Sequence, residues 1–379
     1  MKLLYITQSF DDESASGSFS QGLVKEFIED DIDVDVLTFQ HFKKNLSPLL
    51  SERINLYTVP VFWKHGFFKF EFPLLGLSKI IKIISKNKYD IIHSQELFPG
   101  FLGHIAKLKT KKPHILVKEM ASNYPTSHGR VVMFFEKNFI TKLKYDKLVS
   151  WSKFMVEEFF IKWGVPKEKI EIISGGIDFD EIPKRVNTEE VKRHYNIGNE
   201  NTIVITKPLY RTNVYGISYI IRAMKHIVKE IPNTKLLIAG DGVGRPLLEK
   251  LVNEMKISEN IIFLGVLSHK EALILQQIAD VLPHSFVYEP TTSITLLESM
   301  ASGTPIVCTD SGEAKYILKD CGILVKPKDP QNIANGIIKA LTDKTLVNLL
   351  VKRAFGEVKS NYTIEKVAKK YINLYSSFY

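Results

Sequence analysis

The stretch from residue 279 to residue 318 reads ADVLPHSFVYEPTTSITLLESMASGTPIVCTDSGEAKYIL. It holds two short apolar runs, 280–282 and 306–309, which are typical of strands, and between them a helical stretch from about residue 293 to residue 301. A strand, a helix and a second strand in this order predict a right-handed β-α-β unit, whose two strands lie parallel in one sheet. The stretch therefore predicts an α/β fold.

The rest of the chain repeats this alternation of apolar runs and amphipathic helical stretches. The first series of runs lies at 3–7, 34–38, 91–93, 115–118, 148–151 and 170–173. The second series lies at 203–206, 236–239, 261–264, 280–282, 306–309 and 322–325. Two such series, each with helices between its strands, predict two Rossmann-like domains with parallel sheets. Residues 178–201 are polar and contain no strand-like run, so we expect the seam between the domains there.

The composition is that of a packed globular protein. Of the 379 residues 45% are hydrophobic and 25% charged, which excludes a disordered chain, a collagen-like repeat or a coiled coil. No run reaches the ~18 apolar residues that a membrane-spanning helix needs. The start, MKLLYITQSFDDE, has one basic residue and an interrupted apolar run, so we expect no signal peptide. Two cysteines, Cys308 and Cys321, are too few for a disulfide framework; we expect them to be buried thiols in a reducing compartment.

The charge balance favours anionic partners. The chain has 51 basic against 42 acidic residues, a formal net charge of +9. Phosphates, nucleic acid and anionic membranes are all attracted by such an excess, and a generally lysine-rich surface accounts for it equally well.

The opening stretch also carries the strongest candidate site. Thr291, Thr292 and Ser293 stand where the helix would begin, so their hydroxyls and the free amides of the first turn can bind phosphate oxygens. Glu298 lies further along this apolar helix, where a carboxylate needs a partner and could accept hydrogen bonds from both vicinal hydroxyls of a ribose. A second acidic residue, Glu289, precedes the helix.

Two further loops follow strands of the second series. Lys207 and Arg211 come after the run at 203–206, where cations would neutralise a diphosphate leaving group. Gly240 and Gly242 follow the run at 236–239 and allow a close backbone approach at the carboxyl end of a parallel strand. A solvated basic loop and a simple tight turn are the alternatives.

The first βα turn, TQSFDDESASGSFSQG, lacks the GxGxxG spacing of dinucleotide-binding proteins. Gly17 lies there among small residues ahead of a helix, in a loop whose amides could bind an anion. Asp33-Val34-Asp35 matches a metal-binding DxD pattern, but the alternation around it predicts a half-buried strand with both aspartates on the outer face. No His/Cys cluster has the spacing of a zinc site.

Over its whole length the chain resembles a GT-B glycosyltransferase, in particular the retaining glycosyltransferase family 4 (glycosyl transferases group 1). The phrases that carry the resemblance are KYDIIHSQ, KEKIEIISGGIDFDEI, LLIAGDG, IIFLGVLSHKEAL, ADVLPHSFVYE, LLESMASGTPIVCTD and CGILVKPKDPQNIANGI. The resemblance implies two Rossmann-like domains whose parallel sheets face each other across a cleft. Residues 1–180 would bind the acceptor and residues 181–363 the nucleotide-sugar donor. The closing helix at 364–379 could pack on either domain.

The resemblance also implies roles for single residues. Glu298 would bind the ribose, and Glu289 would lie near the transferred sugar. Lys207 and Arg211 would contact the diphosphate, and the backbone around Leu267 would contact the base. Gly17 would contact the diphosphate from the other domain.

Three features depart from the family's pattern. Eight residues separate Glu289 from Glu298 where seven are usual, and the basic pair is Lys then Arg in a longer loop. Glu119 ends a strand where many members have a histidine. His93, Glu119 and His128 are therefore only candidates for the acceptor side.

We accordingly expect a retaining hexosyltransferase that needs neither a metal nor another cofactor. It would move a sugar from a nucleotide-diphosphate sugar to a hydroxyl of a glycan or a lipid-linked acceptor in cell-surface glycan biosynthesis. Aromatic and lysine residues interleave at 61–86 and 131–144, so we expect a cytoplasmic protein that touches the anionic inner face of the membrane.

Two other functions remain open at this point. One is a nucleotide-sugar 2-epimerase of the same fold. The other is a non-enzymatic basic binding protein, for which KLKTKK at 107–112 is the motif, although no recognised nucleic-acid module accompanies it and nucleic acid is not an expected partner.

Overall fold

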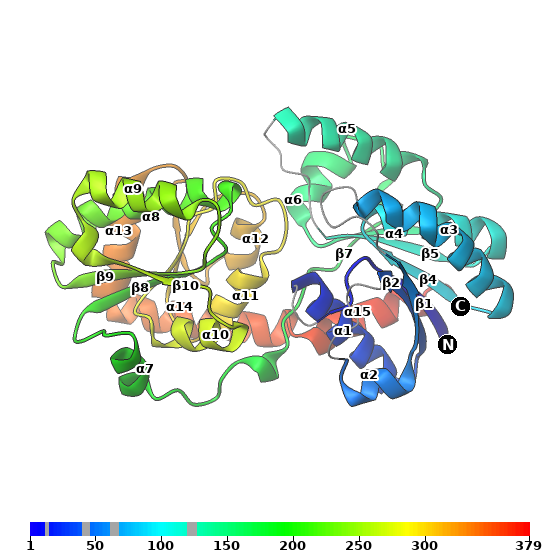
Figure 1. The fold of residues 1–379 in the computed structure, drawn as a ribbon, viewed down its shortest axis with the longest axis horizontal. Helices are drawn as coiled ribbons and strands as arrows, with labels where there is room; N and C mark the ends of the chain where they lie inside the picture. The colour runs from blue at the N-terminus through cyan, green and yellow to red at the C-terminus, as the bar shows by residue number, and fades with distance from the viewer. Residues whose placement is uncertain (12–14, 40–45, 61–67, 120–126) are drawn as a thin grey trace. The chain divides into compact units, whose positions relative to one another are not determined.

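The computed structural model describes residues 1–11, 15–39, 46–60, 68–119 and 127–379 of the chain. The chain forms two compact units, drawn in Figure 1. The first unit consists of Met1–Gly176, Pro290–Thr292 and Ile364–Tyr379, and the second of Ile177–Glu289 and Ser293–Thr363.

The first unit is built on a seven-stranded parallel sheet in the order β3-β2-β1-β4-β5-β6-β7. Its strands are β1 (Lys2–Ile6), β2 (Asp33–Phe39), β3 (Asn55–Val59), β4 (Ile91–Gln95), β5 (His114–Lys118), β6 (Lys147–Ser150) and β7 (Ile170–Ile172). Leu4, Ile92 and Leu116 in its centre are fully buried, because helices cover both faces. The strand order reverses between β1 and β4, the switch point at which open α/β sheets bind ligands.

Helices of the first unit lie on the two faces of this sheet (Figure 1). The helix α1 packs against α15 on one face, and α3 packs against α4 on the other. The helices are α1 (Ala15–Glu29), α2 (Pro48–Arg53), α3 (Phe68–Lys86), α4 (Leu97–Thr110), α5 (Ser127–Lys142), α6 (Lys153–Met155) and α15 (Ile364–Ser376). Val367, Tyr371 and Tyr375, spaced by four residues, form the buried stripe of α15.

The second unit holds two three-stranded parallel sheets, in the orders β10-β9-β8 and β11-β12-β13. An isolated bridge between Ile203 and Val281 links β8 to the residue before β11. The strands are β8 (Asn201–Thr206), β9 (Thr234–Ala239), β10 (Ile261–Gly265), β11 (Leu282–His284), β12 (Ile306–Thr309) and β13 (Ile323–Val325).

The helices of this unit bury apolar stripes on those strands; α8 packs on α13, and α11 packs on α14. They are α7 (Thr188–His194), α8 (Arg211–Glu230), α9 (Arg245–Met255), α10 (His269–Ile278), α11 (Ile294–Ala301), α12 (Ala314–Leu318), α13 (Pro330–Thr342) and α14 (Lys344–Asn361). Both cysteines are free and buried, as predicted. None of the helices that the structure describes is long and apolar enough to span a membrane.

The expected strands are present, displaced by one or two residues at some ends, and one further strand appears. This additional strand, β3, is half-buried at the edge of the first sheet. It has no continuous apolar run, since an edge strand is not enclosed on all sides, and the sequence pattern therefore did not reveal it.

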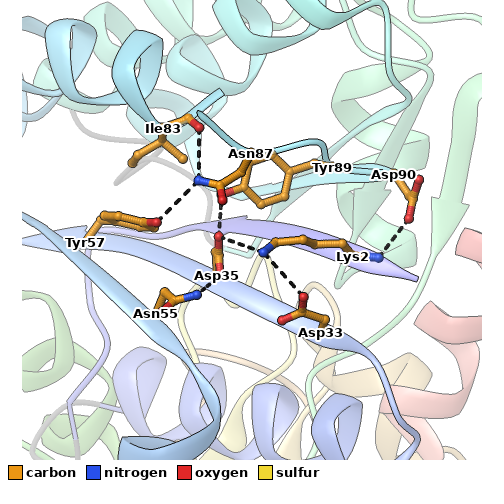
Figure 2. Close-up of polar contacts among 9 residues, drawn as sticks. All are labelled: Lys2, Asp33, Asp35, Asn55, Tyr57, Ile83, Asn87, Tyr89 and Asp90. Atoms are coloured by element: carbon orange, nitrogen blue, oxygen red, sulfur yellow. Dashed lines mark hydrogen bonds and ion pairs between the residues drawn. The ribbon is translucent and has the colours of Figure 1, made fainter. Parts of the chain in front are cut away.

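The pair Asp33 and Asp35 lies in β2, but the prediction that both face outward was wrong. Asp33 is exposed, whereas Asp35 is fully buried, and Figure 2 shows the residues around the two carboxylates. Asn55 donates a 2.8 Å hydrogen bond to Asp35, Tyr89 donates another of 2.5 Å, and the Lys2 Nζ atom lies 3.5 Å away. These partners satisfy the buried carboxylate, which therefore ties the first strands of the sheet together.

Candidate functional site

The carboxyl edge of β8 presents Lys207, the first predicted cation. Its side chain is half-buried, and its Nζ atom lies 3.8 Å from the centre of the Phe286 ring. Burial lowers the pKa of Lys207, while the charge of Glu289 acts in the opposite direction. The structure therefore brings Lys207 and Glu289, which are 82 residues apart in sequence, into electrostatic reach of each other.

Gly240 and Gly242 follow β9 and pack against the loop that carries Lys207. Their φ angles are +139° and +149°, which only glycine adopts readily. A Cβ atom on Gly240 would lie 2.0 Å from the carbonyl oxygen of Lys207, and one on Gly242 would lie 2.8 Å from that of Leu209. Both glycines thus allow two backbone segments to meet at the carboxyl edge.

Glu289 is held through its backbone. Its carbonyl oxygen accepts a 2.7 Å hydrogen bond from the amide of Glu313. Gly312, with a φ of +58°, lies so close that a Cβ atom there would be 1.8 Å from the same oxygen. The turn before α12 therefore sets the position of Glu289.

The helix α11 carries Glu298 and begins at Ile294, directly after its cap residue Ser293. The hydroxyl of Ser293 accepts a hydrogen bond from the Leu296 amide, so it caps the helix. The Glu298 side chain is only 12% exposed, and its Oε1 atom lies 2.8 Å from Nε2 of His269. Glu298, by this hydrogen bond, raises the pKa of His269, a residue that our site prediction did not include. The family-like phrase IIFLGVLSHKEAL contains it, but nothing in the spacing connects it with Glu298.

A buried polar network holds α11 against the sheet, and the sequence pattern did not reveal it either. The Ser299 hydroxyl lies 2.9 Å from Nε2 of His284 and donates a 3.1 Å hydrogen bond to Gln276. Gln276 in turn donates to the Thr206 hydroxyl at the end of β8. Burial lowers the pKa of His284, which therefore stays neutral. This network fixes the helix that presents Glu298.

Two predicted donor-side residues have no described polar contact of the expected kind. Leu267 is half-buried, and its side chain packs on the apolar cluster around Val204 and Leu237. Arg211 is the first residue of α8, but its side chain lies outside the described part of the chain. Their roles stay predictions.

Thr291 and Thr292 belong to the first unit. The Thr291 hydroxyl donates a hydrogen bond to the carbonyl oxygen of Glu119, and the Thr292 hydroxyl donates one of 2.6 Å to that of Trp151. These two hydroxyl protons are therefore already used, which leaves the hydroxyl oxygens as acceptors.

Gly17 lies in the first turn of α1, which begins at Ala15, and not in a loop ahead of the helix as predicted. A Cβ atom on Gly17 would lie 2.5 Å from the carboxylate of Asp11. The glycine therefore permits a close approach of the helix to the segment that follows β1.

The acceptor-side candidates differ in their surroundings. His93 is fully buried in β4, where its Nδ1 atom lies 2.6 Å from the Tyr375 hydroxyl and its ring stacks on Tyr5. Burial lowers its pKa to about 3, so this neutral histidine holds α15 against the sheet. His128 is in α5, but its side chain lies outside the described residues. Glu119 follows β5 and is buried.

In chemical terms, the second unit places a cation, two carboxylates and close-packed glycine loops at the carboxyl edge of its sheets. Open α/β sheets bind their ligands at this edge. Within the described ranges, no group of three or more His, Cys, Asp or Glu side chains is placed to hold a metal ion.

Comparison with protein families agrees with this arrangement. Residues 18–181 match the family model Glycosyltransferase Family 4, and residues 187–356 match Glycosyl transferases group 1. The two models together span most of the chain, which therefore belongs to glycosyltransferase family 4 and is a glycosyltransferase of the GT-B fold.

Among curated relatives, an uncharacterised glycosyltransferase of Methanocaldococcus jannaschii is 28% identical over 99% of this chain and 98% of its own length. The alpha-monoglucosyldiacylglycerol synthase of Streptococcus pneumoniae is 25% identical over 73% of this chain and 65% of its own length. The Escherichia coli UDP-Gal:alpha-D-GlcNAc-diphosphoundecaprenol alpha-1,3-galactosyltransferase is 24% identical over 79% of this chain and 78% of its own length.

Solved structures show the same fold at low sequence identity. Sucrose-phosphate synthase from Thermosynechococcus elongatus superposes with a TM-score of 0.82 and 17% identity over 100% of this chain and 99% of its own. Anabaena HepE in complex with UDP gives the same TM-score and identity over 100% of both chains. These likenesses confirm the GT-B architecture of two Rossmann-like domains.

The contact between Gly312 and Glu289 leads to a prediction on stability. Replacing a glycine of positive φ by alanine costs about 1–3 kcal/mol of folding stability. Gly312 and Gly303 both have such a φ. Gly303 has a φ of +82° and open space around its Cβ position, so Gly303→Ala carries this strain alone. We expect Gly312→Ala to lose about 1–3 kcal/mol more folding stability than Gly303→Ala, because the backbone of Glu289 must also move. Urea unfolding of both variants measures the difference, and equal losses would contradict the contact.

Proposed function

We propose that the chain is a retaining hexosyltransferase of the EC 2.4 class whose donor is a nucleotide-diphosphate sugar. The observation that carries the proposal is the convergence of Lys207 and Glu289 at the carboxyl edge of the second unit, with Glu298 on the neighbouring helix. Structures of HepE from Anabaena contain UDP and UDP-glucose, which makes uridine nucleotides the first probes to use.

In this proposal each part of the donor meets a different residue. Glu298 accepts hydrogen bonds from the ribose hydroxyls, and the backbone around Leu267 meets the base. Lys207, with Arg211, neutralises the diphosphate, which the loops at Gly240 and Gly242 can approach closely. Glu289 faces the transferred sugar.

The reaction breaks the bond between the anomeric carbon and the diphosphate oxygen and forms one to the acceptor oxygen on the same face. The proton of the acceptor hydroxyl passes to the departing phosphate, so nucleoside diphosphate and glycoside are the products. Charge develops on the leaving phosphate, and a fixed ammonium group stabilises it more in the transition state than in the ground state. The Lys207 ammonium supplies this stabilisation.

We further propose a lipid-linked acceptor at an anionic membrane, as a step of cell-surface glycan biosynthesis. The names of two relatives support a lipid, since one mentions diacylglycerol and the other diphosphoundecaprenol. The helices α3 and α5 of the first unit expose large apolar side chains: Leu74, Leu75, Leu77, Ile81, Phe134, Phe135 and Phe139. Exposed lysines such as Lys82, Lys137 and Lys142 lie on the same helices, which suits an anionic bilayer surface.

Glu298→Gln tests the donor site. It keeps the shape of the side chain but loses one charge-assisted hydrogen bond to the ribose, which contributes ~1.5–3 kcal/mol. The affinity for UDP, measured by calorimetry, should therefore fall on the order of ten- to a hundredfold. His269→Gln is the matched control: it keeps a donor beside Glu298 and should bind UDP like the wild type. Glu289→Gln should reduce turnover more than UDP affinity. Unchanged UDP binding by Glu298→Gln would refute the ribose assignment.

Transfer should not depend on a divalent metal. Since Lys207 and Arg211 are proposed to neutralise the diphosphate, we expect UDP-sugar turnover to continue in excess EDTA. Sugar transfer from UDP-glucose is compared with and without the chelator. Activity that EDTA abolishes and only Mg²⁺ or Mn²⁺ restores would contradict this mechanism.

Binding to lipid vesicles tests the membrane proposal. Co-sedimentation should be strong with anionic vesicles, weak with neutral ones, and reduced by high salt. Replacing Phe134 and Phe135 by serine should reduce it, whereas Leu247→Ser, which changes an exposed leucine of the second unit, should not. Equal binding to both kinds of vesicle, or none to either, would exclude the proposal.

A further inference from the structure

In the part of the chain that the structure describes, three carboxylates and one ammonium group lie around the end of β5. Lys118 is only 4% exposed and forms ion pairs with Glu96 and, at 3.4 Å, with Glu136. Glu119, the next residue, is 1% exposed. Lys118 is thus engaged by two carboxylates other than Glu119.

Glu119 makes few polar contacts for a buried carboxyl group. Its Oε2 atom accepts a 2.9 Å hydrogen bond from the Ser16 hydroxyl, and its Oε1 atom is buried without a hydrogen-bond partner in the described part of the chain. Its own amide donates a 2.8 Å hydrogen bond to Glu96, which brings a second carboxylate beside it. A buried carboxylate with one hydroxyl donor and a like charge as neighbour is strongly disfavoured.

The groups that face Glu119 from other elements agree with this state. Tyr5 in β1 and Tyr371 in α15 are buried and lie within its electrostatic influence. A tyrosine oxygen can accept from the O–H of a neutral acid. Burial and the charge of Glu96 raise the pKa of Glu119 to about 8, although Ser16 and Lys118 act against this shift.

We propose that Glu119 is a neutral carboxylic acid at neutral pH and a positioning residue of the transferase. Through Oε2 it fixes Ser16 in the first turn of α1, beside Gly17. Through its carbonyl oxygen it fixes Thr291, which lies two residues after Glu289. The catalytic consequence rests on the function proposed above; the protonation state does not.

The Glu119→Gln variant reports on the protonation state directly. Glutamine has the shape and hydrogen-bonding pattern of the neutral acid but no proton to lose. The folded wild type holds its proton up to about pH 8, whereas the unfolded chain releases it near the ordinary carboxyl value. Wild-type stability therefore falls as the pH rises toward about 8. Over this range the melting point of Glu119→Gln should rise relative to that of the wild type. Infrared difference spectra at neutral pH should show a protonated carboxyl band that the variant lacks.

The positioning role is tested by the pH dependence of kcat/KM with the UDP-sugar used above. The wild type should lose activity as the pH rises through about 8, while Glu119→Gln should stay within about threefold at pH 7 and show no such loss. Glu119→Asp keeps the carboxyl group, but the shorter side chain no longer reaches Ser16. The kcat/KM should therefore fall on the order of ten- to a hundredfold.

Glu96→Gln is the matched control in the same cluster. It removes the neighbouring charge and one of the two carboxylate partners of Lys118, so the pKa of Glu119 should fall and the loss of activity should move to lower pH.

The outcomes separate the two proposals. A Glu119→Gln variant that is inactive at every pH, or a wild type without the protonated carboxyl band, would overturn the neutral-acid assignment. If no UDP-sugar is turned over at all, the proposed function fails, while the melting points and infrared spectra still decide the state of Glu119.

Discussion

Burial of parallel strands on both faces is the constraint on which the rest of this structure depends. Helices enclose strands such as β1 and β4, and residues such as Leu4 and Ile92 are completely removed from water. A polar side chain in the middle of such a strand needs a partner, so chemistry is concentrated where strands end. Lys207 follows β8 and Glu119 follows β5 for this reason. Both belong to the carboxyl edges, where the connecting loops gather.

Close backbone packing at these edges decides which residues are possible there. Gly240 and Gly242 let one loop touch the next, and Gly312 does the same beneath Glu289. Their positive φ angles and the short distances to neighbouring carbonyl oxygens leave no room for a side chain. The glycines thus act first on the shape of the backbone, and any ligand meets a surface that they have already fixed.

Polar groups that are nevertheless buried reach neutrality in different ways. Asp35 has Asn55, Tyr89 and Lys2 around it (Figure 2), and His93 stays unprotonated and binds Tyr375. For Glu119 the neighbouring ammonium group of Lys118 is already shared by two carboxylates, and retention of a proton is the route that we propose. The same electrostatic rule therefore explains a structural carboxylate, a structural histidine and a proposed positioning acid.

The sequence by itself determined the α/β class, the two series of strands and the helix that carries Glu298, because these follow from local periodicity and from the capping residue Ser293. It also singled out Lys207, which follows a strand directly, and Glu289, the acidic residue ahead of the helix that carries Glu298. Only the tertiary structure decided that His269 pairs with Glu298, that Asp35 is buried, and that Lys118 beside Glu119 pairs with two other carboxylates. A hydrogen bond between residues 29 positions apart leaves no periodic trace in the chain. Burial and charge balance depend on all the elements that pack around a group, and these come together only in the folded protein.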